Sequence, residues 1–232
     1  MNNNPNRSHP YDALLIVGPT GSGKTPLGNY LARFGTGKRK CHHFDFGANL
    51  RKIAVRSAST SILSGRETAV VHQVLNSGAL LENENFIIAQ KILLSFLRKT
   101  GMTAQDLLIL NGLPRHVDQA ENMARLAAVR MVIYLACSAE IIHKRISRNS
   151  GGDRIRRSDD SPTEISRKIS IFHDRTVGLL DYYRSRNLPV LTFPVGIDTR
   201  PPDILDGLTD IDTFLDQARL ISNMRKGDIY WV

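Results

Sequence analysis

The sequence predicts an α/β fold with three layers, in which helices cover both faces of a central five-stranded parallel sheet. Short apolar segments alternate with longer segments of helical pattern along the 232 residues of the chain, which is typical of parallel strands joined by crossover helices. The apolar segments are continuous rather than alternately apolar and polar, which indicates strands buried on both faces. A chain of this length can form such a sheet as one domain.

Five segments are expected to form the strands. In chain order they are Asp12–Val17, Cys41–Phe46, Leu107–Leu110, Met131–Ala136 and Pro189–Val195. The expected helices are one that ends near Phe34, then Asn49–Ala58, Glu67–Leu75, Glu84–Lys99, Arg115–Val129, Ala139–Arg148, Ser161–Arg186 and a last one from Pro201 towards Met224. The long helix has a typical start, because Pro162 can occupy its first position and Glu164 follows Ser161 by three residues.

The composition excludes several classes of protein. Hydrophobic residues make up 41% of the chain and charged residues 23%, which excludes a wholly disordered chain. The two cysteines, Cys41 and Cys137, are too few for a disulfide framework and favour a reducing compartment. Residues 1–10 are polar, and no stretch approaches the ~18 apolar residues of a membrane span. We therefore expect a cytoplasmic protein without a membrane partner.

The chain carries a net charge of +9 at pH 7, which favours anionic partners. Aromatic residues are only 6% of the chain, and no run of five basic residues occurs. Stacking platforms for nucleic acid are therefore poorly supported. Small phosphorylated ligands are the better expectation.

A glycine-rich motif directly follows the first expected strand. Residues 18–25 fit the pattern G-x-x-x-x-G-K-[ST] and open a helix, as a phosphate-binding loop requires. Glycines let successive backbone N–H groups point at one anion, and the helix N-terminus adds positive potential. Lys24 would neutralise phosphate oxygens, and the Thr25 hydroxyl would ligate Mg²⁺. The predicted nucleoside triphosphate contacts of this loop are Gly18, Gly21, Ser22, Gly23, Lys24 and Thr25.

Two further patterns accompany this loop. Asn111-Gly-Leu-Pro-Arg115, with Gln119 four residues later, follows the third expected strand, and a glycine-rich, highly charged segment covers residues 149–160. With the loop, they resemble the adenylate kinase and nucleoside monophosphate kinase family, whose patterns are D-G-[FY]-P-R-x-x-x-Q and R-x-D-D. The likeness extends in order from Asp12 to about Pro202.

The resemblance implies a three-layer P-loop kinase fold with a helical acceptor-binding insertion and a short lid. The core would comprise residues 11–46, 83–148 and 161–232, with the insertion at 47–82, the lid at 149–160 and a polar tail at 1–10. The implied activity is ATP-dependent phosphoryl transfer to a nucleoside monophosphate, with Mg²⁺ as cofactor. The family habit also implies a monomer.

The resemblance also implies a role for individual residues. Arg51 and Arg115 would clamp the acceptor phosphate, and Thr25 and Asn111 would lie at the metal. The implied catalytic residues are Lys24, Arg115, Arg148, Arg157 and Lys168, with Arg167 as the alternative to Lys168. The implied acceptor contacts are Phe46, Leu81, Gly112 and Gln119, while Arg145 would stack on the donor adenine and Arg200 would lie at its edge.

Three positions depart from the family pattern. Asn111 replaces an aspartate near the hydrated Mg²⁺, and Ala48 replaces a second carboxylate on the acceptor side. Loss of negative charge at both positions should weaken metal positioning. Phe46 replaces a small hydroxyl residue that touches the acceptor base, so the identity of that base is left open.

These departures leave two alternatives beside a nucleoside monophosphate kinase. Asp45, at the end of the second expected strand, could act as a base in a kinase of a small hydroxyl substrate. The simpler interpretation of Asp45 is a cap of the following helix. The other alternative is a degenerate relative that binds ATP without efficient transfer.

Overall fold

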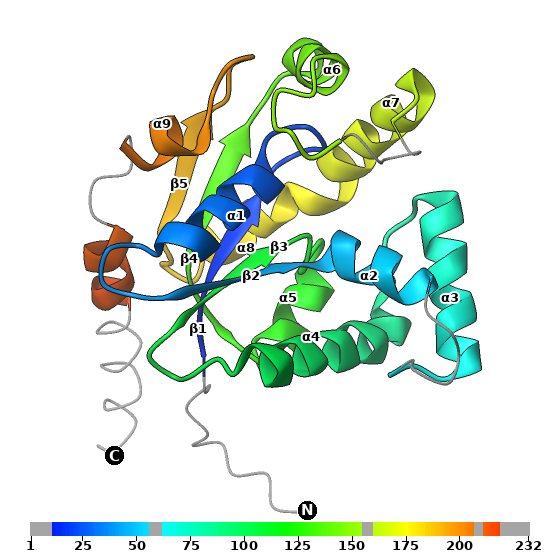
Figure 1. Ribbon diagram of the computed structural model, residues 1–232, viewed down its shortest axis with the longest axis horizontal. Coiled ribbons are helices and arrows are strands. Elements are labelled where there is room, and N and C mark those ends of the chain that lie inside the picture. The colour runs from blue at the N-terminus through cyan, green and yellow to red at the C-terminus, as the bar shows by residue number, and fades with distance from the viewer. Residues whose placement is uncertain (1–10, 56–61, 155–159, 207–210, 219–232) are drawn as a thin grey trace, which may run out of the picture.

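The computed structural model describes residues 11–55, 62–154, 160–206 and 211–218. Its centre is a five-stranded sheet in which every pair of neighbouring strands is parallel (Figure 1). The strand order is β2 (Cys41–Asp45), β3 (Leu107–Asn111), β1 (Asp12–Val17), β4 (Ala128–Ala136) and β5 (Val190–Pro194). The predicted fold class and sheet are confirmed.

Both faces of the sheet are covered, as continuous apolar strands require. In β1, Leu14 and Ile16 pack on one face and Ala13, Leu15 and Val17 on the other. The first face is covered by α1 (Lys24–Phe34), α9 (Pro201–Asp206) and the helical residues 211–218. The second face is covered by α4 (Phe86–Thr100), α5 (Val117–Met123) and α8 (Gly178–Arg184).

Two helices extend from the β2 side of the sheet, between β2 and α4 in the chain (Figure 1). They are α2 (Phe46–Ala54) and α3 (Gly65–Ser77), and a 3-10 turn, η2 (Asn83–Asn85), leads into α4. The predicted helix over Asn49–Ala58 starts earlier, at Phe46, because the Asp45 carboxylate caps it by accepting from the Ala48 amide at 2.8 Å. Its predicted residues 56–58 lie outside the described residues.

The chain returns over the sheet through α6 (Ala139–Ser147) and α7 (Pro162–Ile171). The single helix predicted over Ser161–Arg186 consists of α7, a π-helical turn η3 (Phe172–Thr176) and α8. The spacing of buried residues does not distinguish this π turn from an α-helix. Its buried residues, Phe172 and Thr176, are four positions apart, which is the spacing that an α-helix would also give.

The boundary between α5 and β4 was predicted wrongly. The helix expected over Arg115–Val129 ends at Met123, and β4 begins at Ala128 rather than Met131. Arg130 interrupts the apolar pattern of this strand, but its Nε donates to the buried Asp12 carboxylate at 2.7 Å. Because Asp12 neutralises the charge of Arg130, this arginine can lie within β4.

The helix predicted from Pro201 towards Met224 is described in two parts. The first, α9, covers Pro201–Asp206, and residues 211–218 are also helical. The rest of this prediction lies outside the described residues. Among the helices that the structure describes, none combines the length and apolar character needed to span a membrane.

Candidate active site

The loop between β1 and α1 forms a cradle of backbone amides. Gly21 and Gly23 have φ angles of 77° and 100°, a region that glycine enters without strain. Gly23 is the N-cap of α1 and offers no side chain to the first amides of the helix, which leaves them directed at an anion. The Ser22 hydroxyl is fully buried, with no hydrogen-bond partner in the described part of the chain. These features fit a bound phosphate group.

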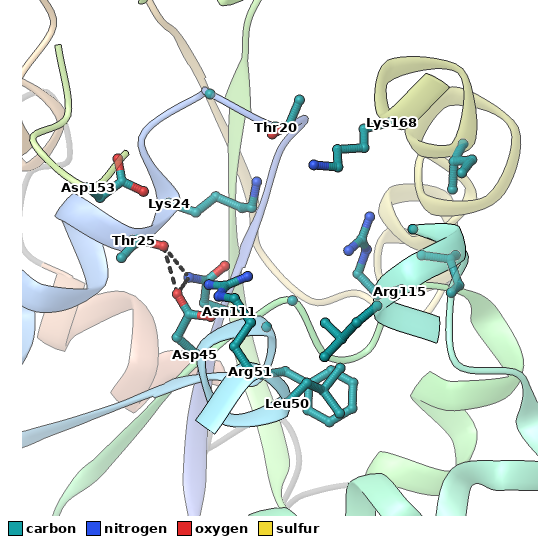
Figure 2. Close-up of a pocket in the computed structure, with 18 of the residues that line it drawn as sticks. Thr20, Lys24, Thr25, Asp45, Leu50, Arg51, Asn111, Arg115, Asp153 and Lys168 are labelled. Carbon is teal, nitrogen blue, oxygen red and sulfur yellow. Dashed lines mark hydrogen bonds between the residues drawn. The ribbon is translucent and has the colours of Figure 1, made fainter. Parts of the chain in front are cut away.

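Lys24 lies across this loop. Its Nζ donates to the carbonyl oxygens of Gly18 and Pro19, both at 2.7 Å. The ammonium group is therefore held by the backbone of the motif itself, and Figure 2 shows it directed into the cavity. A phosphate in the cradle would meet this charge.

Three segments meet beside Lys24 through hydrogen bonds of Asp45. The Thr25 hydroxyl donates to Asp45 Oδ2 at 2.7 Å, and the Asn111 amide donates to the same oxygen at 3.1 Å (Figure 2). The Asn111 amide also lies 3.2 Å from Thr25 Oγ1. Within the described residues, no group of three or more His, Cys, Asp or Glu side chains could hold a metal by itself. A cation here would need oxygens from its nucleotide as well.

The environment of Asp45 keeps it ionised. Burial alone would raise the pKa of this carboxyl group, but hydrogen bonds from the Ala48 amide and the Thr25 hydroxyl outweigh burial and lower it. The neighbouring His43 has a pKa lowered by burial. Its Nδ1 lies 2.9 Å from Asn29 Oδ1 and its Nε2 3.4 Å from the Asn111 amide, contacts that suit a neutral ring. Asp45 is thus the negative group of this cluster.

Arg51, from α2, and Arg115, from the turn after β3, also line the cavity. Arg51 extends toward Asp45 and Asn111, and Arg115 lies across the cavity from Thr25 (Figure 2). Burial lowers the pKa of Arg115 from its ordinary value. Among the described residues, its guanidinium group makes no hydrogen bond or ion pair. A half-buried cation whose guanidinium group has no partner among the described residues fits an anionic ligand. The structure therefore brings the two predicted clamp arginines to one cavity.

Gln119 holds this end of the cavity together. Its Oε1 accepts from the Arg115 amide at 2.8 Å, and its Nε2 donates to the Leu81 carbonyl at 2.6 Å. Gln119 is fully buried, so its amide links the turn after β3 to the segment before α4. This positioning contact was not anticipated from the sequence, which indicated an acceptor contact.

The wall between the two ends is apolar on the α2 and α3 side. Phe46 and Leu81 are buried and line the cavity, and Gly112 lines it with a φ of 79°. Phe46 also packs against Phe44, with ring centroids 6.2 Å apart. Its ring is therefore part of the core as well as of the cavity. Further apolar lining comes from Leu50, Val74, Leu75 and Leu80.

The lid segment contributes Arg154, which the sequence patterns had not singled out as a contact. Its guanidinium donates to Asp160 at 2.6 Å and to the hydroxyl of Thr20, in the glycine-rich loop, at 3.1 Å. The predicted Arg157 lies outside the described residues. The predicted Arg148 is exposed at the C-cap of α6 and does not line the cavity, so its catalytic role stays a prediction.

Neighbouring residues of α7 point in different directions. Lys168 lines the cavity with its amino group directed inward (Figure 2). Arg167 donates instead to the Ser77 carbonyl at the end of α3 and to Glu164. The geometry therefore favours Lys168 over Arg167 as the cation of this helix at the site.

Of the two residues predicted at the donor adenine, Arg145 lines the cavity and Arg200 does not. Arg145 is 4% exposed, and its guanidinium donates to the carbonyls of Gly21, Gly196, Ile197 and Thr199 at 2.6–3.1 Å. It thus ties the cradle to the loop before α9. Arg200 is exposed, and its backbone amide donates to Asp203 at 2.7 Å. The predicted adenine contacts of both residues stay predictions.

Comparison with known proteins agrees with this geometry, although no family model matches the chain. A probable UMP-CMP kinase 1 of Arabidopsis thaliana is 28% identical over 179 residues, which cover 75% of this chain and 76% of the relative. Adenylate kinases of Stenotrophomonas maltophilia strain K279a and Synechococcus sp. strain WH7803 are 28% and 26% identical, each over 75% of this chain and 86% of the relative. Over three quarters of its length, the chain is thus similar to adenylate kinases and UMP-CMP kinases. It has the phosphate-loop motif and the two arginines predicted to clamp the acceptor, while Asn111 and Ala48 depart from the family pattern.

Proposed function

We propose that this protein transfers the γ-phosphoryl group of ATP to the phosphate of a nucleoside monophosphate. The observation that carries the proposal is a single cavity that holds a phosphate cradle and two arginines. Lys24 lies at the cradle and Arg115 across the cavity from it, while Arg51 extends toward Asp45 and Lys168 lies over the space between Lys24 and Arg115 (Figure 2). Two phosphate-bearing substrates could therefore meet end to end.

Charge explains why such a reaction needs this arrangement. Phosphoryl transfer between two anions requires positioning and stabilisation of negative charge more than covalent chemistry. Arginine forks grip phosphate oxygens at two points, and lysine adds a compact charge. An acceptor phosphate oxygen would attack the γ-phosphorus while the bond to the β–γ bridging oxygen breaks, which gives ADP and a nucleoside diphosphate.

The geometry does not favour Asp45 as a general base for a hydroxyl acceptor. Both of its carboxylate oxygens already accept hydrogen bonds, from the Ala48 amide and from Thr25 and Asn111. Its lowered pKa also makes it a weak base. A phosphate acceptor is already anionic and needs no base. The cap of α2 that the sequence suggested for Asp45 is present.

The donor oxygens present suit Mg²⁺, which is bound by one or two carboxylates together with substrate phosphates. Thr25 would hold the ion, with Asn111 beside it as the sequence predicts, and the ion supplies charge neutralisation for the transferred group. The retained cavity at both ends speaks against a degenerate, binding-only relative. Dependence on Mg²⁺, a monomeric state and a cytoplasmic location stay predictions from the sequence.

A screen of acceptors tests the proposal. The protein is incubated with ATP and Mg²⁺ and, in separate reactions, with AMP, CMP, UMP, GMP or dTMP, and the nucleotides are separated by chromatography. We expect at least one nucleoside diphosphate to form in equal amount to ADP, and almost no ADP without an acceptor, because a closed cavity excludes water. Binding of ATP without a diphosphate product from any acceptor would contradict the proposal.

A further inference from the structure

The carboxylate of Asp45 lies outside the family patterns found in the sequence. Asp45 ends β2 and Asn111 ends β3, and the two residues are register partners on neighbouring parallel strands. Side chains that pair in register lie side by side at the same sheet edge. A carboxylate on either strand can therefore reach the Thr25 hydroxyl, and in this chain Asp45 does so at 2.7 Å.

The hydrogen bonds give Asp45 and Asn111 distinct roles. Asn111 donates to Asp45 Oδ2 at 3.1 Å, so the amide supports the carboxylate rather than competing with it. The Thr25 hydroxyl donates its proton to the same oxygen and accepts from the Asn111 amide at 3.2 Å, which leaves one lone pair for another partner. A magnesium ion at the phosphate loop requires such a lone pair.

No other carboxylate is engaged with this hydroxyl in the described part of the chain. Asp153 also lines the cavity, but it lies by Arg154, with 3.9 Å between its Oδ2 and that arginine's Nε. Ala48, where the family has its second carboxylate, uses its backbone amide to bind Asp45 Oδ1 at 2.8 Å. The carboxylate at position 45 is thereby held at both oxygens and directed at the loop.

We propose that Asp45 supplies the carboxylate of the magnesium site, taking over from β2 the charge that Asn111 and Ala48 lack. This inference rests on the proposed function for the presence of Mg²⁺ with ATP. It assigns to Asp45 the orientation of the Thr25 hydroxyl and the negative charge facing the cation. Asp45 is thus a metal-site residue. The negative charge that the family carries at position 111 is supplied in this chain from position 45.

The test separates charge from helix capping. Asp45→Asn removes the negative charge, yet asparagine caps helices as well as aspartate does. Binding of the non-transferable β,γ-imido analogue of ATP is measured by calorimetry in Mg²⁺ and in EDTA. Asp106→Asn is the matched control, because Asp106 also accepts from a backbone amide, at 2.9 Å, and contacts a histidine, at 3.2 Å.

We expect Asp45→Asn to change the affinity for the analogue differently in Mg²⁺ and in EDTA. In Mg²⁺, Asp45→Asn should weaken binding of the analogue about tenfold or more, as loss of a metal-orienting group does. In EDTA the same variant should bind equally or more tightly, because a negative charge beside the phosphates has gone. Asp106→Asn should leave both affinities within about twofold of the parent protein.

A charge swap sharpens the result. The double variant Asp45→Asn with Asn111→Asp moves the carboxylate to its register partner and should recover most of the Mg²⁺-dependent affinity. Asp45→Ser, which also retains a capping side chain, repeats the test if the first variant is unstable to heat. An unchanged ratio of affinities with and without Mg²⁺ in a folded Asp45 variant would overturn the inference.

The outcome is independent of the proposed function. Analogue binding needs no acceptor and no turnover, so it can succeed even if the acceptor screen yields no diphosphate. Conversely, a protein that phosphorylates a nucleoside monophosphate but ignores the charge at Asp45 would retain its function and refute only the metal assignment.

Discussion

The two ends of the cavity are built from different parts of the polypeptide. The donor end is one contiguous loop that offers mainly backbone amides, and Lys24 donates to the Gly18 and Pro19 carbonyls of the same loop at 2.7 Å. The acceptor end is assembled from side chains of α2, the turn after β3 and α7. A contiguous backbone loop is specified locally, whereas an assembled site depends on how distant elements pack.

This difference indicates how each end should respond to substitution. A change at the donor end should remove nucleotide binding itself, because no other element supplies the cradle. A change at the acceptor end should affect one contact and leave the donor end intact. The substitutions below test that separation, from the largest expected effect to the smallest.

Lys24→Met should have the largest effect. It removes the charge that faces the transferred phosphate while keeping an unbranched side chain of similar length, so turnover should fall by about a thousandfold. The measurement is turnover with the best acceptor from the screen. Lys144→Met is the control, because Lys144 is exposed and pairs with Glu140 at 2.5 Å. A loss below about tenfold in Lys24→Met would argue against a cradle centred on this loop.

Lys168→Met should have an intermediate effect that Arg167→Met does not share. Lys168 is directed into the cavity, while Arg167 is engaged with Ser77 and Glu164. We expect turnover to fall about a hundredfold for Lys168→Met and less than about fivefold for Arg167→Met, since partly exposed ion pairs contribute little. Equal losses for these neighbours would show that the register of α7 at the site is misassigned.

Gln119→Leu should have the smallest effect on turnover and a measurable effect on stability. It leaves the Leu81 carbonyl and the Arg115 amide without their partner, and each unsatisfied buried group costs about 1–3 kcal/mol. We expect acceptor KM to rise about tenfold as Arg115 loses its support, with a lower unfolding temperature. Glu121→Leu, at an exposed position on the same helix, controls for helix effects. An unchanged acceptor KM would mean that the amide has no role in placing Arg115.

The same difference explains what could be predicted from the sequence. The strands were found because apolar runs such as Leu107–Leu110 report burial directly, and the donor loop was found because its motif is local. The start of β4 was missed because Arg130 is neutralised by Asp12, which lies 118 residues away in the chain. Such a pairing leaves no local signal.

On the acceptor side, the sequence predicted which residues take part but not which contacts each of them makes. Arg51 and Arg115 were expected at one site and do line one cavity. The choice between Arg167 and Lys168 depends on how α7 is rotated against α3, which a stretch of adjacent charged residues does not reveal. Arg154 belongs to the charged segment of the sequence, and its guanidinium donates to the Thr20 hydroxyl of the glycine-rich loop at 3.1 Å. Only the folded chain joins these positions.

The separation of the two ends can be tested most directly with Arg115→Ala. Calorimetry would give the affinity of the β,γ-imido analogue of ATP and of the preferred monophosphate in the parent protein and in this variant. We expect the monophosphate affinity to fall by about a hundredfold, as loss of a buried charged contact implies, while the analogue affinity stays within about twofold. An equal loss for both ligands would contradict the assignment of separate donor and acceptor ends.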